Sequence, residues 1–187
     1  MAAKVRGTAL LANRQFLVKE FGPDAFDRVL ASIEKTHADA LRVIPLAQDW
    51  FPAASMVASL VASARLFAPD DPDRFYEAVG AHGAEYDLNF IHRFLLRFTN
   101  PLWMMERGAK LWREYHNSGE WDIQQGATPH SIVGTLREFA VVSAPMCRTV
   151  VGFVRRAGQL TGAKQMQVTH PRCRAAGAQV CVFEGVW

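Results

Sequence analysis

The hydrophobic pattern of this sequence changes once, near Gly119, and that change limits the fold more than any other feature does. From Leu10 to about Asn117, apolar residues recur three and four positions apart, as on the buried faces of amphipathic helices. After Gly119, apolar and polar residues alternate over short runs, which is typical of strands. The sequence therefore predicts an α+β fold, with a helical half over about residues 1–118 and a sheet over about residues 119–187.

Breaks rich in Gly and Pro divide the helical half into five or six segments of helix length. Pro72, which follows two aspartates, is expected to begin one helix, because Asp caps helices and Pro fits their first turn. Asn100 is expected to cap a helix over Pro101–His116, and Ser118-Gly119 is expected to end it.

The C-terminal third predicts the order strand, strand, helix, strand, strand, and we expect these strands to form one antiparallel sheet. The predicted strands and helix are, in chain order, Trp121–Thr128, Ile132–Phe139, the helix Ala144–Gln159, Gln165–Thr169 and Val180–Trp187.

Length and composition favour one compact domain over residues 1–187, because a 187-residue chain that is half hydrophobic can bury one core and a ligand cavity. The net charge is only +3, and the basic residues are spread along the chain, so we expect no nucleic-acid partner. No apolar run is long enough to span a bilayer and no signal-peptide pattern follows the N-terminus, so we expect no membrane association and a cytoplasmic location.

Three cysteines and one histidine near the C-terminus have the spacing C-x22-H-x2-C-x7-C, formed by Cys147, His170, Cys173 and Cys181. Thiolate and imidazole are preferred zinc ligands, and four protein ligands are typical of structural rather than catalytic zinc. Gly177 would let the loop between Cys173 and Cys181 turn back. The pattern predicts zinc as the cofactor; the alternative is three small buried cysteines and a surface histidine.

The run V-T-H-P-R-C-R-A-A-G-A-Q-V-C-V-F-E, with Gly162-Ala163 before it, resembles the C-terminal signature of 4-vinyl reductase-type domains. Those domains are the sensor portion of bacterial activators that respond to phenols and related aromatics. Their zinc ligands run cysteine, glutamate, cysteine, cysteine, so His170 stands here at the glutamate position. The resemblance covers roughly Met146–Glu184. Upstream, W-F-P at Trp50–Pro52 and the N-P-L-W-M-M-E-R segment resemble the wider fold group shared with heme-nitric-oxide-binding domains.

The resemblance implies a cavity between the helices and the sheet that holds a small apolar or aromatic molecule. Aromatic side chains in the middle of the chain are the candidates to line it, and His92 and Trp121 are the candidates for its polar groups, with Tyr86 and Tyr115 as weaker ones. The alternative is that these side chains form an ordinary core. The predicted ligand-binding residues are His92, Phe94, Phe98, Trp103, Trp112 and Trp121.

Three functions compete for this sequence. The main prediction is a zinc-containing sensor or adaptor domain that acts through homodimerisation or a protein partner. One alternative is a heme or gas sensor of the related fold, although Tyr115 to Gly119 does not form the Y-x-S-x-R clamp of those domains. Another is a structural interaction module without a ligand. We expect no enzyme, because the sequence has no G-x-G-x-x-G after a strand, no G-x-S-x-G and no H-E-x-x-H.

Overall fold

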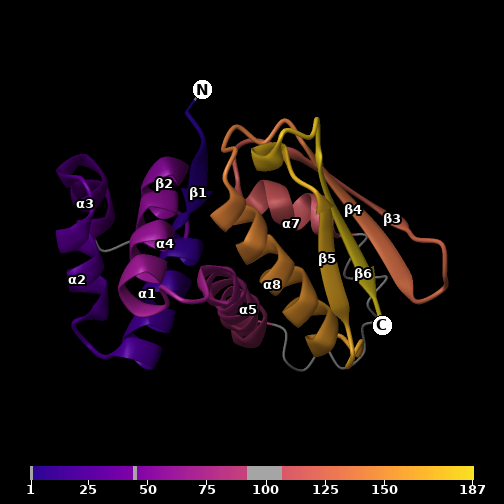
Figure 1. The fold of residues 1–187 in the computed structure, drawn as a ribbon, viewed down its shortest axis with the longest axis horizontal. Coiled ribbons are helices and arrows are strands. Elements are labelled where there is room, and N and C mark those ends of the chain that lie inside the picture. The colour runs from indigo at the N-terminus through magenta and orange to yellow at the C-terminus, as the bar shows by residue number, and fades with distance from the viewer. Residues whose placement is uncertain (1, 44–45, 92–106) are drawn as a thin grey trace.

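The computed structural model describes residues 2–43, 46–91 and 107–187. Helices from the first half of the chain form one side of the molecule, and a four-stranded sheet forms the other side, with one long helix between them (Figure 1). This arrangement confirms the predicted mixture of helices and antiparallel sheet.

The N-terminal side consists of α1 (Gly7–Phe21), α2 (Ala25–Ser32), α3 (Lys35–Arg42), α4 (Ala53–Phe67) and α5 (Pro72–Ile91). Each of α1 to α4 buries one apolar stripe, which in α1 includes Leu10 and Leu17, 1% and 0% exposed. As expected, α5 begins at Pro72, and the preceding Asp71 carboxylate accepts a bond from the Arg74 backbone N–H at 3.1 Å.

The C-terminal sheet contains β3 (Glu120–Gln125), β4 (Ser131–Arg137), β5 (Gln167–Arg172) and β6 (Cys181–Val186). Their spatial order is β3-β4-β6-β5, and every neighbouring pair is antiparallel. The chain visits them in the predicted order, with α8 (Ala144–Leu160) between the second and third strands. The pairing of β5 with β6 is irregular between Thr169 and Arg172, which is where the H-P of the metal motif lies.

Two short strands were not predicted: β1 (Lys4–Arg6) and β2 (Trp50–Pro52), which pair antiparallel beside α4. Three residues are too few for a periodic pattern, so only the tertiary pairing of Val5 with Phe51 reveals them. The predicted helix Pro101–His116 is observed as α7 (Gly108–Tyr115). The rest of that segment, residues 101–106, lies outside the described residues.

Helix α8 packs between α5 and the sheet, and its contact with α5 is the most extensive helix pair in the described structure (Figure 1). Ser143 caps α8 by accepting a bond from the Met146 backbone N–H at 3.5 Å. Where the helices cross, a methyl group built on Gly80 would lie 1.9 Å from the Thr149 carbonyl oxygen. One built on Gly152 would lie 1.9 Å from the Glu77 carbonyl oxygen. The two backbones are therefore in direct contact.

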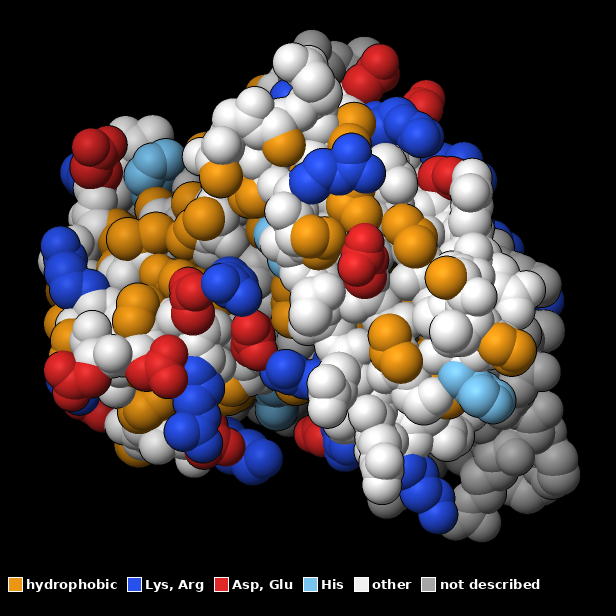
Figure 2. Space-filling view, turned by 45° about the vertical axis from the view of Figure 1, so that its right-hand side comes forward, with side chains coloured by type: hydrophobic (Ala, Val, Ile, Leu, Met, Phe, Trp, Pro, Cys, Tyr) orange, Lys and Arg blue, Asp and Glu red, His pale blue; other side chains and the backbone are white. Residues whose placement is uncertain are grey.

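The distribution of surface charge and the hydropathy of the helices bear on the possible partners of the protein. Basic and acidic side chains are interspersed on the face shown in Figure 2. None of the helices in the described ranges combines the length and the hydropathy needed to cross a membrane.

The helix crossing gives a testable prediction. Gly80→Ala places a methyl group against the α8 backbone, so the helices must separate, and we expect a loss of about 1 to 3 kcal/mol in the free energy of unfolding. Gly83→Ala, three residues further along the same helix, is the matched control, because its methyl group meets only the Phe153 ring at 3.8 Å. We expect that variant to be neutral or up to about 1 kcal/mol more stable. Urea unfolding measures both, and equal effects would contradict the proposed close contact.

Candidate functional site

The structure brings the four residues of the C-x22-H-x2-C-x7-C motif together at one end of α8. Cys147 lies on α8, His170 on β5, Cys173 directly after β5, and Cys181 begins β6. Their candidate ligand atoms all lie within 4.8 Å of one another. All three cysteines are free thiols rather than disulfides. The cluster therefore joins a helix to both strands of a hairpin.

The sulfur positions fit a tetrahedral metal site. The Cys147 Sγ lies 3.7 Å from the Cys181 Sγ and 3.8 Å from the Cys173 Sγ. Two sulfurs bound to one tetrahedral zinc at about 2.3 Å each are about 3.8 Å apart, so the observed spacing needs no rearrangement.

His170 is oriented by a backbone contact. Its Nδ1 donates to the Val182 carbonyl at 2.8 Å, and its ring stacks on Phe183 with centroids 4.2 Å apart. The other ring nitrogen, Nε2, is buried and has no hydrogen-bond partner. A carbonyl that fixes one nitrogen while the other is free is the usual arrangement of a metal-ligating histidine.

The three thiols are close enough together that their ionisation would require a cation among them. Burial first, and then the Cys181 and Cys173 thiols, raise the pKa of Cys147, so ionised sulfurs at this spacing need a positive charge to balance them. The backbone N–H of Arg174 donates to the Cys181 sulfur at 3.3 Å. Gly177 adopts φ of 90°, which provides the turn expected between Cys173 and Cys181. The donor set suits zinc.

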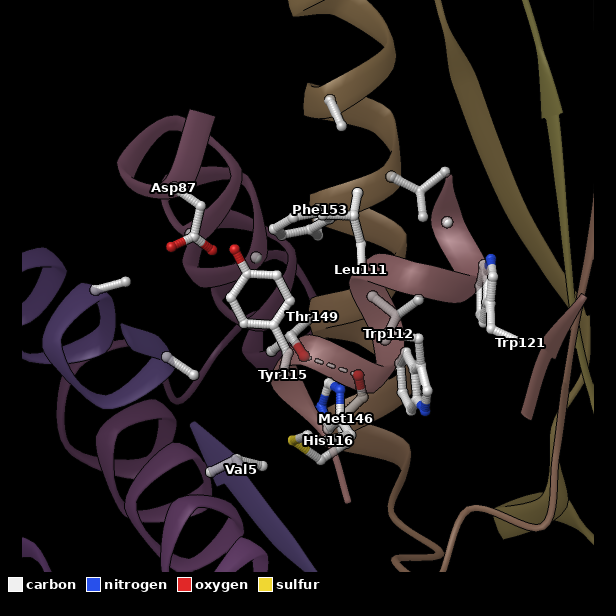
Figure 3. A pocket seen from close by; sticks show the side chains of 18 of the residues that line it. Val5, Asp87, Leu111, Trp112, Tyr115, His116, Trp121, Met146, Thr149 and Phe153 are labelled. Carbon is white, nitrogen blue, oxygen red and sulfur yellow. Dashed lines mark hydrogen bonds between the residues drawn. The ribbon is translucent and has the colours of Figure 1, made fainter. Parts of the chain in front are cut away.

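A separate apolar cavity of about 200 Å³ lies between the two sides of the molecule (Figure 3). Helices α1, α4 and α5 contribute one wall, and α7, α8 and the sheet contribute the other. Its lining is almost entirely apolar; among the larger apolar side chains are Val5, Met56, Val79, Leu111, Trp112, Trp121, Ile123, Ile132, Met146, Val150, Phe153 and Val154.

A few polar side chains interrupt this apolar lining. Asn13 on α1 is 1% exposed; its Nδ2 donates to the Ser59 hydroxyl at 3.2 Å, and its Oδ1 has no partner. Asp87 on α5 and Tyr115 on α7 point toward one another at the cavity wall (Figure 3). His116 stacks on Trp112 at 3.9 Å, and its buried Nδ1 has no partner.

The apolar surroundings shift the pKa values of these groups. Burial raises the pKa of Asp87 to about 7, although the bond from the Tyr115 hydroxyl opposes the shift. Burial, and then the Asp87 charge, raise the pKa of Tyr115. Burial lowers the pKa of His116 to about 4, so its imidazole is neutral at physiological pH. Asp87 is therefore the one of these three groups that changes charge near neutrality.

Of the six predicted ligand-binding residues, Trp112 and Trp121 line the cavity, where their rings stack with centroids 5.6 Å apart. The Trp112 indole N–H donates to the Ser118 carbonyl at 2.9 Å, whereas the hydrogen bonds among the described residues include none from the Trp121 N–H. His92, Phe94, Phe98 and Trp103 lie outside the described residues. Of the two weaker candidates, Tyr115 faces the cavity, whereas Tyr86 is not among its lining residues.

Sequence reasoning missed Asn13, Asp87 and His116. A polar residue inside an apolar helical stripe was the available signal for Asn13, because Leu10, Phe16 and Leu17 flank it on the same buried face. No local signal marks Asp87 or His116, since their role depends on α5 and α7 meeting at the cavity.

No family model and no curated protein matches the sequence. Solved structures of H-NOX proteins resemble the fold over nearly the whole chain. The Fe(II)NO form of an H-NOX protein from S. oneidensis has TM-score 0.69 and 15% identity, covering 96% of this chain and 97% of that one. An H-NOX domain from Shewanella oneidensis in the Fe(II)CO state has TM-score 0.71 and 15% identity, with 97% of both chains covered. The unliganded Fe(II) H-NOX protein from K. algicida has TM-score 0.68 and 10% identity, covering 97% and 95%.

These likenesses show that the chain has an H-NOX-like fold. They agree with the wider fold group to which the sequence resemblance pointed, and they do not confirm its narrower assignment to the 4-vinyl reductase-type domains. Of the predicted functions, the alternative of a gas or heme sensor is the one whose fold is matched.

The raised pKa of Asp87 predicts a pH-dependent stability. The folded state favours the protonated form of the Asp87 carboxyl. The contribution of that protonated carboxyl to the stability of the fold is therefore complete below pH 3.8 and is lost as pH rises through about 7. Asp87→Asn keeps an acceptor for Tyr115 without the charge. We expect it to match the parent protein at about pH 4 and to exceed its stability at about pH 8 by on the order of 3 kcal/mol. Urea unfolding at both pH values measures the difference in stability between Asp87→Asn and the parent protein. If that difference is the same at both pH values, Asp87 does not titrate in this range.

Proposed function

We propose that this chain is a sensor domain of H-NOX-like fold that binds a small, mostly apolar molecule in the cavity between its two sides. The carrying observation is that cavity, about 200 Å³ in volume, whose apolar lining contains a buried, unpartnered Asn13 Oδ1. A cavity of about 150 Å³ lined by apolar side chains is known to bind benzene, so this one has room for an aromatic ring with a short substituent.

The position of the cavity supports sensing. A molecule bound there contacts α1, α4 and α5 on one side and α7, α8 and β3 on the other, so binding favours one relative placement of the two sides. The output would pass through a protein partner or a homodimer, as predicted from the sequence resemblance. Helix α1 buries its apolar stripe within its own chain, against α5, α4 and α2. The homodimer therefore stays a prediction that sedimentation of the purified protein tests.

We propose binding without chemical conversion. Among the described lining residues, the Tyr115 hydroxyl is bonded to Asp87, and the Thr149 hydroxyl donates to the Met146 carbonyl at 2.8 Å. A nucleophile is activated by a neighbouring base or a lowered pKa. The Thr149 hydroxyl faces a backbone carbonyl, which is not a base, and burial and the Asp87 charge raise rather than lower the pKa of Tyr115.

A heme-based gas sensor is the second candidate, because the solved relatives are H-NOX proteins in Fe(II), Fe(II)NO and Fe(II)CO states. One atom fits: the His116 Nδ1 is unpartnered, and the low pKa keeps its imidazole available to a metal. The carboxylates of a heme do not fit, because the described part of the lining has no Lys or Arg and contributes the acid Asp87 instead. The described residues therefore favour a small organic ligand.

A ligand screen tests the proposed function. Filling the cavity should stabilise the fold by about 2.7 kcal/mol at a hundredfold excess over the dissociation constant. We expect a thermal-shift screen of small aromatic and aliphatic compounds to give such stabilisation. Gly83→Leu should remove it by filling the cavity, since position 83 lines the cavity and has only the Phe153 ring near its side-chain position.

Gly83→Ala is the matched control and should respond to the same compounds as the parent protein. A folded protein whose melting temperature no compound raises would contradict the sensor. A Soret band in the purified protein that disappears in His116→Ala would instead support the heme candidate.

We further propose that Cys147, His170, Cys173 and Cys181 bind one structural zinc, which supports the sheet against α8. The support is the 3.7 and 3.8 Å sulfur spacing together with the free, buried Nε2 of His170. A site with four protein ligands has no open position, so its role is stability rather than chemistry.

Metal analysis tests the zinc site. We expect about one zinc per chain, and we expect Cys173→Ser to lose the metal together with much of the stability, because structural zinc binding is worth on the order of 10 kcal/mol in small domains. His170→Glu should retain zinc, since a carboxylate is also a zinc ligand. Arg172→Ser, between two of the proposed ligands on an exposed position, is the control and should keep the metal. A metal-free protein of full stability would reject the site.

A further inference from the structure

Among the described residues, the cavity lining contains hydrogen-bond acceptor positions that no donor fills. The Asn13 Oδ1 is buried and accepts no bond. The Asp87 carboxylate has two oxygens with about four acceptor positions, and the Tyr115 hydroxyl provides one donor to them. Buried acceptors without donors are costly, so a ligand that brings donors gains more than a ligand of the same shape without them.

The cavity also contains an acid without a basic partner in the described structure. Asp87 is held between α5 and α7, and the described lining residues include no Lys or Arg (Figure 3). Aromatic rings form much of the remaining wall, among them those of Trp112, Trp121 and Phe153. The faces of such rings attract cations. The cavity is therefore suited to a positive charge attached to an apolar body.

We propose that the ligand of this cavity is a small apolar primary amine, whose ammonium group donates hydrogen bonds to the Asp87 carboxylate. This inference rests on the proposed function and specifies its ligand class. An ammonium group has three donors and a charge, which matches the acceptor positions of the Asp87 carboxylate and its lack of a basic partner among the described lining residues. A phenol brings one donor and no charge, and a carboxylate ligand would meet the Asp87 charge at close range.

The pH dependence of binding follows from the groups that face Asp87. Tyr115, the last residue of α7, and His116, directly after it, face the cavity. Both are neutral between pH 6 and 8, because burial raises the pKa of Tyr115 and lowers the pKa of His116 to about 4. The polar groups from α1 and α8, Asn13 and Thr149, do not titrate. An aliphatic amine keeps its charge up to about pH 10. Asp87, with a pKa of about 7, is therefore the described group whose ionisation controls amine binding.

Three probes with one ring and one chain length test the proposal: 2-phenylethylamine, 2-phenylethanol and phenylacetate. Isothermal titration calorimetry with the full chain should show the amine binding most tightly at pH 8 and the carboxylate most weakly. From pH 6 to pH 8 the amine affinity should rise about tenfold, following the ionised fraction of Asp87, while the alcohol affinity should stay constant.

Substitutions assign the effect to Asp87. Asp87→Asn should lower the amine affinity at pH 8 at least about tenfold, remove its rise with pH and leave the alcohol affinity within about threefold. Tyr115→Phe removes the hydroxyl beside Asp87 but leaves the Asp87 charge, so this variant should still bind the amine more tightly than the alcohol. Asp73→Asn removes a carboxylate from the exposed start of the same helix and should change none of the affinities.

The outcomes separate this inference from the function on which it rests. If the alcohol binds and Gly83→Leu abolishes its binding, but the amine binds no better at pH 8, the cavity is a ligand site and the amine proposal is wrong. If phenylacetate binds most tightly, the proposed charge complementarity is overturned. If none of the three probes binds and no other apolar compound raises the melting temperature, the proposed function fails together with the inference.

Discussion

The direct backbone contact between α5 and α8 is the constraint on which the rest of the structure depends. Gly80 and Gly152 each face a carbonyl oxygen of the other helix, so no side chain separates the two backbones there. Ion pairs flank this contact, with Glu77 bonded to Arg155 at 2.8 Å and Glu85 bonded to Arg156 at 2.6 Å. Because these pairs are partly exposed, packing rather than charge supplies most of the stability at the crossing.

This crossing also determines where the cavity lies. Helix α1 packs on α5, α7 packs on β3, and the space that the side chains of these elements and of α8 leave between them is the cavity. The same helix α8 carries Cys147 at its first turns, where β5 and β6 bring the other three cluster residues. A metal there would fix the first turns of α8, the helix that lines the cavity, against the sheet.

The polar groups of the cavity oppose stability. The Asp87 carboxyl, whose pKa burial raises to about 7, lowers the stability of the fold at neutral pH, and the unpartnered Asn13 Oδ1 adds a further cost. Stability alone would favour apolar residues at both places. Such groups are common at sites where a ligand supplies the missing partner, which is the physical basis for treating this cavity as a binding site rather than a packing defect.

The sequence by itself determined the α+β class, the order of the C-terminal strands and helix, and the grouping of Cys147, His170, Cys173 and Cys181, because periodicity and ligand spacing are local properties. It did not reveal β1 and β2, whose three-residue strands exist only through pairing between distant segments. It identified Trp112 and Trp121 from their aromatic character but missed Asp87 and His116. Only the tertiary structure decided that these two residues face one cavity, because the approach of α5 to α7 depends on long-range packing that no local pattern encodes.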